Sequence, residues 1–283
     1  MTMPIDPQRV WLITGASSGL GRALAAAVLE RGERVVATAR NRDSVAELEQ
    51  RHPGRAIAAS LDVTDADQAR AALDAAIAAF DRVDVVVNNA GYGLFGALEE
   101  LADDELRAQF ETNVFGVLNV TRAALPHLRR QRGGHIVQIS SLEGVAPMLA
   151  GEAAYAATKF AAEGLCEALA KEVAHLGVRM TIVEPGPVRT DFAAGAVARP
   201  PRSDDYDPSV GDALRLFEQL AGNQPNDPAR VAAGIIQAVD ADAPPLRLAL
   251  GAEALEAIRD KLDGQRRELD AWERVARSTA IAT

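Results

Sequence analysis

Short apolar segments alternate with longer segments of helical periodicity over the first two thirds of the chain. The apolar segments are nearly continuous, which is typical of strands that are buried on both faces. Such strands are predicted at residues 10–14, 34–39, 56–61, 83–88, 134–140 and 178–184. Helices are predicted between them, at residues 19–31, 44–51, 64–80 and 153–176, with one or two helices at 103–130. This alternation predicts an α/β protein with a doubly wound parallel sheet in three layers, α/β/α.

The pattern loosens after Pro187, and residues 193–227 contain four prolines with one short helix predicted at 211–220. Because ligands of open α/β folds bind outside the carboxyl ends of the strands, we interpret this segment as a lid. A surface loop without such a role is the alternative. The rest of the chain predicts a helix, a last strand and a long amphipathic helix, at residues 228–240, 244–250 and 252–277.

Composition and charge narrow the classes of function. Apolar residues make up 48% of the 283 residues and charged residues 25%, which fits a globular protein with a sizeable core. The formal net charge of −10 argues against a general nucleic-acid binder, which needs a basic face. The single cysteine, Cys166, excludes an intramolecular disulfide and favours the reducing cytoplasm. Residues 1–7 lack the apolar segment of a signal peptide, and no stretch reaches the roughly 20 apolar residues of a membrane span.

A glycine-rich turn joins the first predicted strand to the first predicted helix. Glycines let the backbone turn tightly and approach a pyrophosphate, while the helix N-terminus presents free N–H groups to it. The turn therefore predicts a dinucleotide site, although strand-to-helix turns use glycine for structural reasons as well. The candidate residues of this turn are Gly15, Ser17, Ser18, Gly19, Leu20 and Gly21.

The end of the second strand favours NADP(H), with NAD(H) possible. An acidic residue there would accept hydrogen bonds from the ribose hydroxyls of NAD, but the strand ends in Ala39 and is followed by Arg40. A guanidinium can bind the additional 2′-phosphate of NADP with two hydrogen bonds. The alternative is that Arg40 is a solvated loop charge. Asp43 lies three residues too late to replace the missing acid.

Polar and small residues follow the third and fourth strands. Asp62, next to Val63, is placed to meet the amino group of an adenine or to cap the following helix, for which Thr64 and Asp65 are also candidate caps. The fourth strand leads into the sequence Asn88-Asn89-Ala90-Gly91, whose small residues leave room for a ligand. Its asparagines can bond to backbone on both sides.

Tyr155 and Lys159 are four residues apart on a predicted helix, so both lie on one face, one turn apart. A free tyrosine has a pKa near 10, and a nearby ammonium favours the phenolate. The pair predicts a proton-transfer residue, Tyr155, that serves a hydride transfer; a surface pair is the alternative. Ser140 and Ser141 end the fifth strand, where a hydroxyl can polarise a substrate oxygen, although strand ends also carry serine for turns.

Taken together, these residues resemble the short-chain dehydrogenase/reductase family in its single-domain, Rossmann-fold branch. The resemblance covers roughly residues 8–192 and rests on several motifs in the expected order. They are Thr14-Gly-x-x-x-Gly-x-Gly21, Asp62-Val63, Asn88-Asn-Ala-Gly91, Asn113, Ser141 within Ser-Ser-x-x-Gly, Tyr155-x-x-x-Lys159, and Pro185-Gly-x-Val188 with Thr190.

The resemblance implies a catalytic tetrad of Asn113, Ser141, Tyr155 and Lys159. In such enzymes the asparagine helps to hold a water beside the lysine, which completes a proton path. It further implies a cofactor site in which Tyr155 and Lys159 take part and whose nicotinamide side is formed by Pro185, Gly186, Val188 and Thr190. The other cofactor residues expected are Gly15, Ser17, Ser18, Gly19, Leu20, Gly21, Arg40, Asp62, Val63, Asn89, Ala90 and Gly91.

Two features depart from the family pattern. Fourteen positions separate Ser141 from Tyr155, where thirteen are more usual, so the loop 145–154 is expected to bulge by one residue. Ser141 rather than Ser140 receives the catalytic role because Gly144 follows it by three residues. The chain also runs some thirty residues past the usual length, so the helix after Ala252 has no role that the resemblance explains.

The substrate is expected to be a hydrophobic alcohol or ketone, because the residues expected to face the pocket are mostly apolar. Several of them could instead be ordinary core residues. The expected pocket residues are Leu94, Phe95, Glu143, Met148, Leu149 and Phe192.

The sequence therefore predicts a cytoplasmic NADP(H)-dependent oxidoreductase in one domain, with core 8–192, lid 193–227 and a C-terminal strand and helices at 228–283. Two alternatives are a non-catalytic nucleotide sensor on the same fold and an epimerase or dehydratase with tightly held nicotinamide. The expected partner is a small carbonyl or alcohol, with no nucleic acid and no membrane. The resemblance also implies a homodimer or homotetramer, paired through helices near 103–130 and 153–176.

Overall fold

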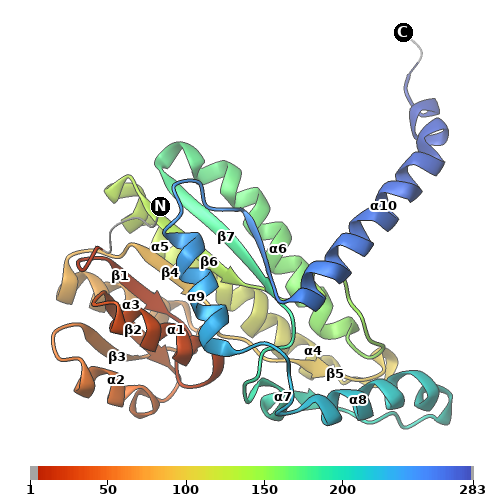
Figure 1. The fold of residues 1–283 in the computed structure, drawn as a ribbon, viewed down its shortest axis with the longest axis horizontal. Coiled ribbons are helices and arrows are strands. Elements are labelled where there is room, and N and C mark those ends of the chain that lie inside the picture. Colours follow the sequence, from red (N-terminus) through yellow and green to blue (C-terminus); the bar gives the residue numbers. More distant parts are fainter. Residues whose placement is uncertain (1–5, 282–283) are drawn as a thin grey trace.

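The computed structural model describes residues 6–281. Residues 1–5, which belong to the segment 1–7 where no signal peptide is expected, and residues 282–283 lie outside it. Seven parallel strands form one sheet between two layers of helices, in the order β3-β2-β1-β4-β6-β7-β9 (Figure 1). The predicted doubly wound α/β class is thereby confirmed. The strands are β1 (Val10–Ile13), β2 (Arg34–Ala39), β3 (Ala56–Ser60), β4 (Val85–Asn88), β6 (Gly134–Ile139), β7 (Val178–Pro185) and β9 (Arg247–Leu250).

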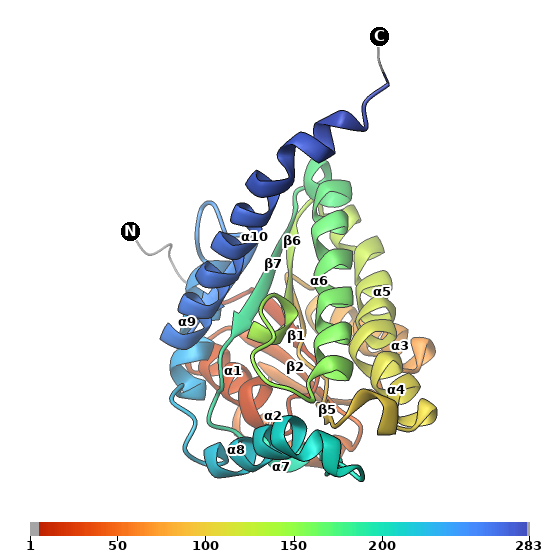
Figure 2. The same ribbon diagram turned by 90° about the vertical axis from the view of Figure 1, so that its right-hand side faces the viewer.

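The helices divide between the two faces of the sheet. Residues of α1, α2 and α9 share one apolar cluster, and residues of α3, α5 and α6 share another on the opposite face. Figure 2 shows this separation, with α9 and α10 on one side and α3, α5 and α6 on the other. These helices are α1 (Gly19–Glu30), α2 (Ala46–Arg51), α3 (Ala66–Phe80), α5 (Gly116–Gln131), α6 (Ala153–Val173), α9 (Pro228–Val239) and α10 (Ala252–Ser278).

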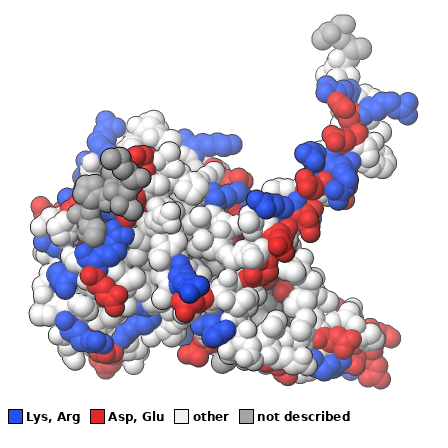
Figure 3. Space-filling model, in the orientation of Figure 1, with Lys and Arg blue, Asp and Glu red and all other residues white. Residues whose placement is uncertain are grey.

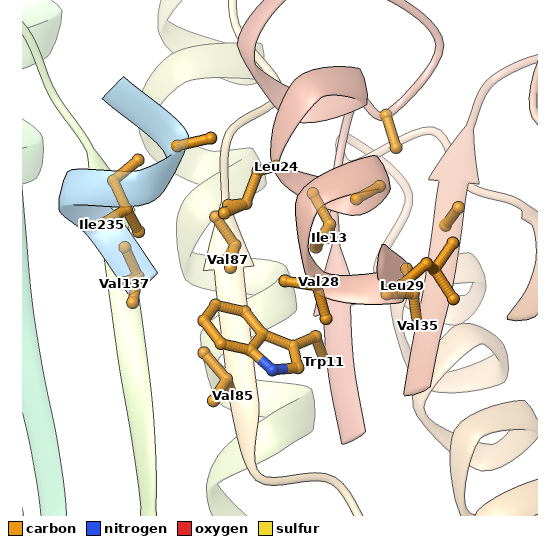
Figure 4. Packing of buried hydrophobic residues seen from close by; sticks show 14 of the residues in the cluster. Trp11, Ile13, Leu24, Val28, Leu29, Val35, Val85, Val87, Val137 and Ile235 are labelled. Atoms are coloured by element: carbon orange, nitrogen blue, oxygen red, sulfur yellow. The ribbon is translucent and has the colours of Figure 1, made fainter. Parts of the chain in front are cut away.

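Strand β1 shows why the sheet needs both layers. Its side chains alternate between the faces, as in any strand, and all four are apolar and fully buried. Trp11 and Ile13 lie in the cluster with α1 and α9 (Figure 4), whereas Val10 and Leu12 lie in the cluster with α3 and α5. The indole Nε1 of Trp11 donates to Glu33, 2.5 Å away, so its one polar atom is not left unpaired.

The segment predicted as one or two helices is two helices joined by a π-helical turn. Helix α4 (Asp103–Phe110) and helix α5 flank this turn, which spans Glu111–Phe115. The turn carries Asn113, whose side chain points inward and is 2% exposed. Single π-turns inside helices are frequent at functional sites, and this one inserts an extra residue where the polar side chain is needed.

The segment after β7 is more structured than the sequence predicts. The short helix predicted at 211–220 is confirmed as α8 (Asp212–Leu220), and α7 (Phe192–Gly195) precedes it. A two-stranded parallel sheet, β5 (Leu94–Phe95) with β8 (Val197–Ala198), ties the segment to the loop after β4. The sequence predicts neither strand, because two residues are too few to show a period.

The C-terminal elements follow their predicted order. Helix α9 packs on α1, and β9 extends the sheet beside β7 in parallel register. Helix α10 then leaves the body of the protein (Figure 1). Between residues 6 and 281, no helix combines the length and the apolarity that a bilayer crossing requires.

Candidate active site

The ends of six parallel strands open into one cavity of about 700 Å³. In a doubly wound sheet all strands point the same way, so the residues that follow them meet at one edge. Residues predicted from six separate stretches of sequence therefore line a common space. They include Gly15 after β1, Arg40 after β2, Asp62 after β3, Asn89 after β4, Ser141 after β6 and Gly186 after β7.

The glycine-rich turn has the geometry of an anion cradle. Gly15 has a φ of +65°, and a Cβ there would lie 3.0 Å from the Cα of Ala90. The Nδ2 atom of Asn89 donates to the carbonyls of Thr14 (2.8 Å) and Gly15 (3.1 Å) and holds the turn in place. Ser18 caps α1 without a side-chain hydrogen bond, so the first N–H groups of the helix are free for a ligand.

Of the six candidate residues of this turn, only Gly21 does not line the cavity. A Cβ on it would come within 2.6 Å of the Gly15 carbonyl oxygen. Its role is therefore the close approach of α1 to the turn, whereas Gly15, Ser17, Ser18, Gly19 and Leu20 face the cavity. A phosphate-bearing group fits this cradle, because small residues, free N–H groups and a helix N-terminus converge on it.

The part of the cavity next to β2 and β3 contains Arg40, which is exposed and follows β2 directly. Asp62 and Val63 line the same region. The Asp62 carboxylate accepts hydrogen bonds from the N–H (3.0 Å) and hydroxyl (2.7 Å) of Thr64. The interpretation of Asp62 or Thr64 as the cap of α3 is wrong, because Asp65 caps it by accepting from two N–H groups of its first turn.

Tyr155 and Lys159 are both buried on the cavity-facing side of α6, one turn apart. The Nζ of Lys159 donates to the Ile139 carbonyl, 3.0 Å away, and lies 5.6 Å from the centre of the Tyr155 ring. Burial lowers the pKa of Lys159 to about 8, although the carboxylates of Glu163 and Glu143 favour its charged form. Burial also raises the pKa of Tyr155, and the negative charge of Glu143 adds to this effect.

Asn113 stands behind this pair. Its Nδ2 donates to the Tyr92 carbonyl (2.9 Å) and to the Thr158 hydroxyl (3.0 Å), and its Oδ1 accepts from the Tyr92 N–H (3.1 Å). Thr158 in turn donates to the Tyr155 carbonyl, so Asn113 braces the first turn of α6. A Cβ on Gly91 would lie 3.0 Å from Asn113 Oδ1 and 3.9 Å from Lys159 Nζ. Gly91, Asn113 and Lys159 therefore meet at one point.

The two serines at the end of β6 differ in their partners. The Ser140 hydroxyl donates to the buried carboxylate of Glu163, 2.5 Å away. The Ser141 hydroxyl donates instead to the carboxylate of Glu143, which lines the cavity. Burial raises the pKa of Glu143, whereas its bond to Ser141 and the ammonium of Lys159 act in the opposite direction. Ser140 is thus tied to the helix behind it, and Ser141 to a neighbour in the cavity.

The cavity contains a second carboxylate, that of Glu152, which the sequence does not predict. It is 6% exposed and accepts hydrogen bonds from the N–H groups of Met148 (3.1 Å) and Leu149 (2.9 Å). Burial and the nearby charge of Glu143 raise its pKa to about 7. Its position comes from the loop before α6, where no periodic pattern indicates which side chains turn inward.

Aromatic rings form the other wall of the cavity. The ring of Phe95 lies 5.5 Å from that of Tyr155 and 4.9 Å from that of Phe217 on α8, and Phe192 lies 5.8 Å from Tyr155. Phe217 was missed because it belongs to the loosely patterned segment, and so were Leu220 and Gln224, which also line the cavity.

Of the expected pocket residues, Phe95, Glu143, Leu149 and Phe192 line the cavity. The other two expectations are wrong. Leu94 is 1% exposed and packs in a small core cluster, because neighbouring residues of a strand face opposite ways. Met148 is 58% exposed and does not line the cavity.

The nicotinamide side expected from the family motif lies in the same cavity. Pro185, Gly186, Val188 and Thr190 all line it, next to the glycine-rich turn. A Cβ on Gly19 would touch the Thr190 side chain at 3.4 Å, so the two loops are adjacent.

Comparisons with known proteins agree with this geometry. The family model described as short chain dehydrogenase matches residues 9–200. The chain is 39% identical to an oxidoreductase of Botryotinia fuckeliana, over 88% of this chain and 90% of that protein. It is 35% identical to a 3-ketodihydrosphingosine reductase of Bacteroides thetaiotaomicron, over 87% of this chain and 89% of that protein. The chain therefore belongs to the short-chain dehydrogenase family of oxidoreductases.

Solved structures extend the comparison to the fold and to cofactors. A short-chain dehydrogenase from Streptomyces avermitilis is 44% identical, with a TM-score of 0.87 and coverage of 96% of this chain and 100% of that one. A relative from Burkholderia phymatum in complex with NAD is 26% identical (TM-score 0.79; coverage 91% and 95%). One from Burkholderia cenocepacia in complex with NADP is 28% identical (TM-score 0.72; coverage 94% and 98%). Structural neighbours thus bind NAD or NADP.

Proposed function

We propose that this protein is an NADP(H)-dependent oxidoreductase that interconverts a carbonyl group and a secondary alcohol of a hydrophobic small molecule. The observation that carries the proposal is the position of Tyr155. It is buried beside Lys159 and the end of β6, in the same cavity as the glycine-rich cradle. A buried tyrosine with a lysine one turn away suits proton transfer next to a bound dinucleotide.

Each residue of the proposed tetrad has a distinct task. Tyr155 gives its proton to the substrate oxygen in the reductive direction and takes it back in the oxidative direction. The ammonium of Lys159 favours the phenolate of Tyr155 and so opposes the effect of burial. Ser141 holds the substrate oxygen by a hydrogen bond, and Asn113 keeps the first turn of α6 in position through Thr158. The bound nicotinamide supplies or accepts the hydride.

The cofactor residues follow from the lining of the cavity. The cradle holds the pyrophosphate, and Arg40 binds the 2′-phosphate, which favours NADP(H) over NAD(H). Asp62 and Val63 flank the adenine. The remaining contacts come from Asn89, Ala90, Gly91, Tyr155, Lys159, Pro185, Gly186, Val188 and Thr190.

The substrate end supports an apolar molecule. Phe95, Phe192, Phe217 and Leu149 provide most of its walls, and segment 193–227 contributes to them as a lid. A relative whose name denotes reduction of a keto group on a long-chain base supports the same class of substrate. A cytoplasmic location and a homo-oligomer are further parts of the proposal; they rest on the lone Cys166 and on the family's usual assembly.

The test is hydride transfer with the purified protein. We expect NADPH oxidation with at least one ketone of an apolar panel, followed at 340 nm. In Tyr155→Phe the rate falls at least ~100-fold, the usual scale of a lost general acid, while NADPH still protects the protein against unfolding to the same extent. Tyr206→Phe, at a tyrosine that does not line the cavity, is the control and keeps its rate. Equal rates in Tyr155→Phe and the parent would refute the role of Tyr155.

A further inference from the structure

The last helix of the chain has only a short anchor on the body. Ala254 and Ile258, in its first two turns, are buried against Leu142 and Ala146 in the loop after β6. From Arg259 to Ser278 no residue of α10 is buried, and only Gly264 is half-buried. Figures 1 and 2 both show this half projecting away from the sheet. Some twenty residues of helix thus lie in solvent without a partner in their own chain.

The projecting half carries an apolar stripe rather than a uniformly polar surface. Leu262, Leu269 and Trp272 are 54%, 73% and 66% exposed. With Leu255 and the anchored Ile258 they follow a spacing of alternately three and four positions, which places them along one side of a helix. The full series is Leu255, Ile258, Leu262, Gln265, Leu269, Trp272 and Ala276.

This spacing is typical of the residues that form the seam of a two-stranded coiled coil. An isolated helix of this length gains little from propensity alone, and its stability in proteins comes from packing an apolar face. The rest of the projecting surface is densely charged with both signs (Figure 3), as expected for the outer faces of a paired helix. An exposed tryptophan and two leucines in one row point to a missing partner.

We propose that α10 pairs with α10 of a second copy of this chain, antiparallel, with Leu269 packed against the partner's Trp272. A two-fold axis then passes between these residues, and each chain contributes the same patch, as in most homodimers. This contact is separate from the family's usual helix pairs and from the cavity.

The charged residues that flank the seam favour an antiparallel over a parallel arrangement of the two helices. If Leu262 and Leu269 occupy the first seam position of successive heptads, the flanking positions hold Lys261, Arg266, Glu268 and Glu273. Parallel pairing would set Lys261 opposite the partner's Arg266 and Glu268 opposite the partner's Glu273, which are like charges. Antiparallel pairing about Leu269 and Trp272 sets Arg266 opposite the partner's Glu273, twice by symmetry, with no like-charged pair.

The packing of the first turns of α10 on the body limits how far the two helices can overlap, and so sets their register. In this pairing Ser278, the last residue of one helix, lies level with residue 263 of the other, beyond the anchored Ile258. Sliding the helices by one heptad toward greater overlap would bring the end of the partner's helix level with residue 256, between Ala254 and Ile258, where α10 is already packed on the body. The axis lies about twelve residues beyond Ile258, or about 18 Å of helix, which separates the two bodies.

The flanking groups are free to make these contacts. The side chains of Arg266 and Glu273 are 73% and 58% exposed. Each has a partner within its own helix, Asp263 at 3.3 Å and Arg277 at 2.7 Å. Such exposed pairs contribute little and are easily exchanged for a pair across an interface.

The test is the molar mass of the full-length chain in sedimentation velocity over a range of concentrations. We expect the mass to fall by half in Leu269→Glu and in Arg266→Glu, with helix content and NADPH binding unchanged. The double variant Arg266→Glu with Glu273→Arg restores the parent mass, because the opposite charges are exchanged. Lys261→Glu is the control and changes nothing, since Lys261 faces no charge in the antiparallel pair.

Three results would overturn the proposal. One is a mass that none of these substitutions changes, which would place any self-association elsewhere. A second is loss of association in Arg266→Glu without recovery in the double variant, which would mean that the stripe packs on another surface. The third is stronger association in Lys261→Glu, which would indicate parallel helices.

Discussion

The hydroxyl of Ser141 donates its hydrogen bond to the carboxylate of Glu143, two residues further along the loop after β6. In the proposed reaction the same hydroxyl must bind the substrate oxygen, so the substrate competes with Glu143 for it. The carboxylate also raises the pKa of Tyr155, because a negative charge nearby disfavours the phenolate. One side chain therefore acts on two members of the proposed tetrad.

Replacing Glu143 by Gln should shift the pH profile of alcohol oxidation to lower pH. Tyr155 must be deprotonated to accept a proton in this direction, and loss of the negative charge makes deprotonation easier. We expect the apparent pKa of kcat/KM to fall by about one pH unit, the usual scale for one nearby charge. The measurement is the initial rate with NADP+ between pH 6 and 10. Glu256→Gln, on the exposed side of α10, is the control; a profile unchanged in Glu143→Gln would mean that Glu143 does not act on Tyr155.

Glu152 should make the protein less stable as the pH rises from about 4.5 to 7. Its pKa is raised to about 7 in the folded protein, so the folded state holds a proton that the unfolded chain has already lost. The stabilisation is complete below the unfolded pKa of 4.5 and is lost as the pH passes through 7. Its upper limit is about 3 kcal/mol.

Urea unfolding of Glu152→Gln at pH 5 and pH 8 measures this effect. The amide oxygen can still accept from the N–H groups of Met148 and Leu149, so the fold should persist. The variant should gain stability relative to the parent at pH 8 and lose that advantage at pH 5. The exposed Glu47→Gln serves as the control. A stability difference between Glu152→Gln and the parent that is the same at both pH values would contradict the assignment.

Arg40 should determine the preference between the two nicotinamide cofactors. A charge-assisted hydrogen bond contributes about 1.5–3 kcal/mol, so Arg40→Ala should lower the ratio of kcat/KM for NADPH over NADH by about 10- to 100-fold. Arg42→Ala is the matched control, because Arg42 bonds to the Ala58 carbonyl and to Glu49 instead of facing the cavity. An unchanged ratio in Arg40→Ala would count against NADP(H).

Arg247 should be one of the most important charged residues for stability. From β9 it reaches Glu163 on α6 and Glu184 on β7, each 2.5 Å away, and both carboxylates are 3% exposed. Arg247→Met leaves these buried carboxylates without a cation, which typically costs about 3–5 kcal/mol. The free energy of unfolding in urea measures the loss. Arg51→Met, which removes an exposed pair with Glu47, should cost less than about 0.5 kcal/mol; equal losses would mean that the buried cluster is not stabilising.

Much of the fold was predictable because its determinants are local. Near-continuous apolar runs such as residues 34–39 identify buried parallel strands wherever they occur. Gly32 and Gly177 mark helix ends because they adopt positive φ angles, of 89° and 76°. The family followed from motifs with fixed spacing, such as Tyr155 and Lys159, since a helix places residues four apart on one face whatever surrounds them.

What the sequence by itself determined is therefore the α/β class, the order of its main elements, the family and many of the residues that line the cavity. Only the tertiary structure decided that Glu152 enters the cavity, that Leu94 and Met148 do not, and that Asn113 sits on a π-turn. Those outcomes depend on loops and on contacts between distant segments, such as β5 with β8. The physical reason is that periodicity records which face of an element is buried, whereas a loop side chain is directed by whatever packs against it.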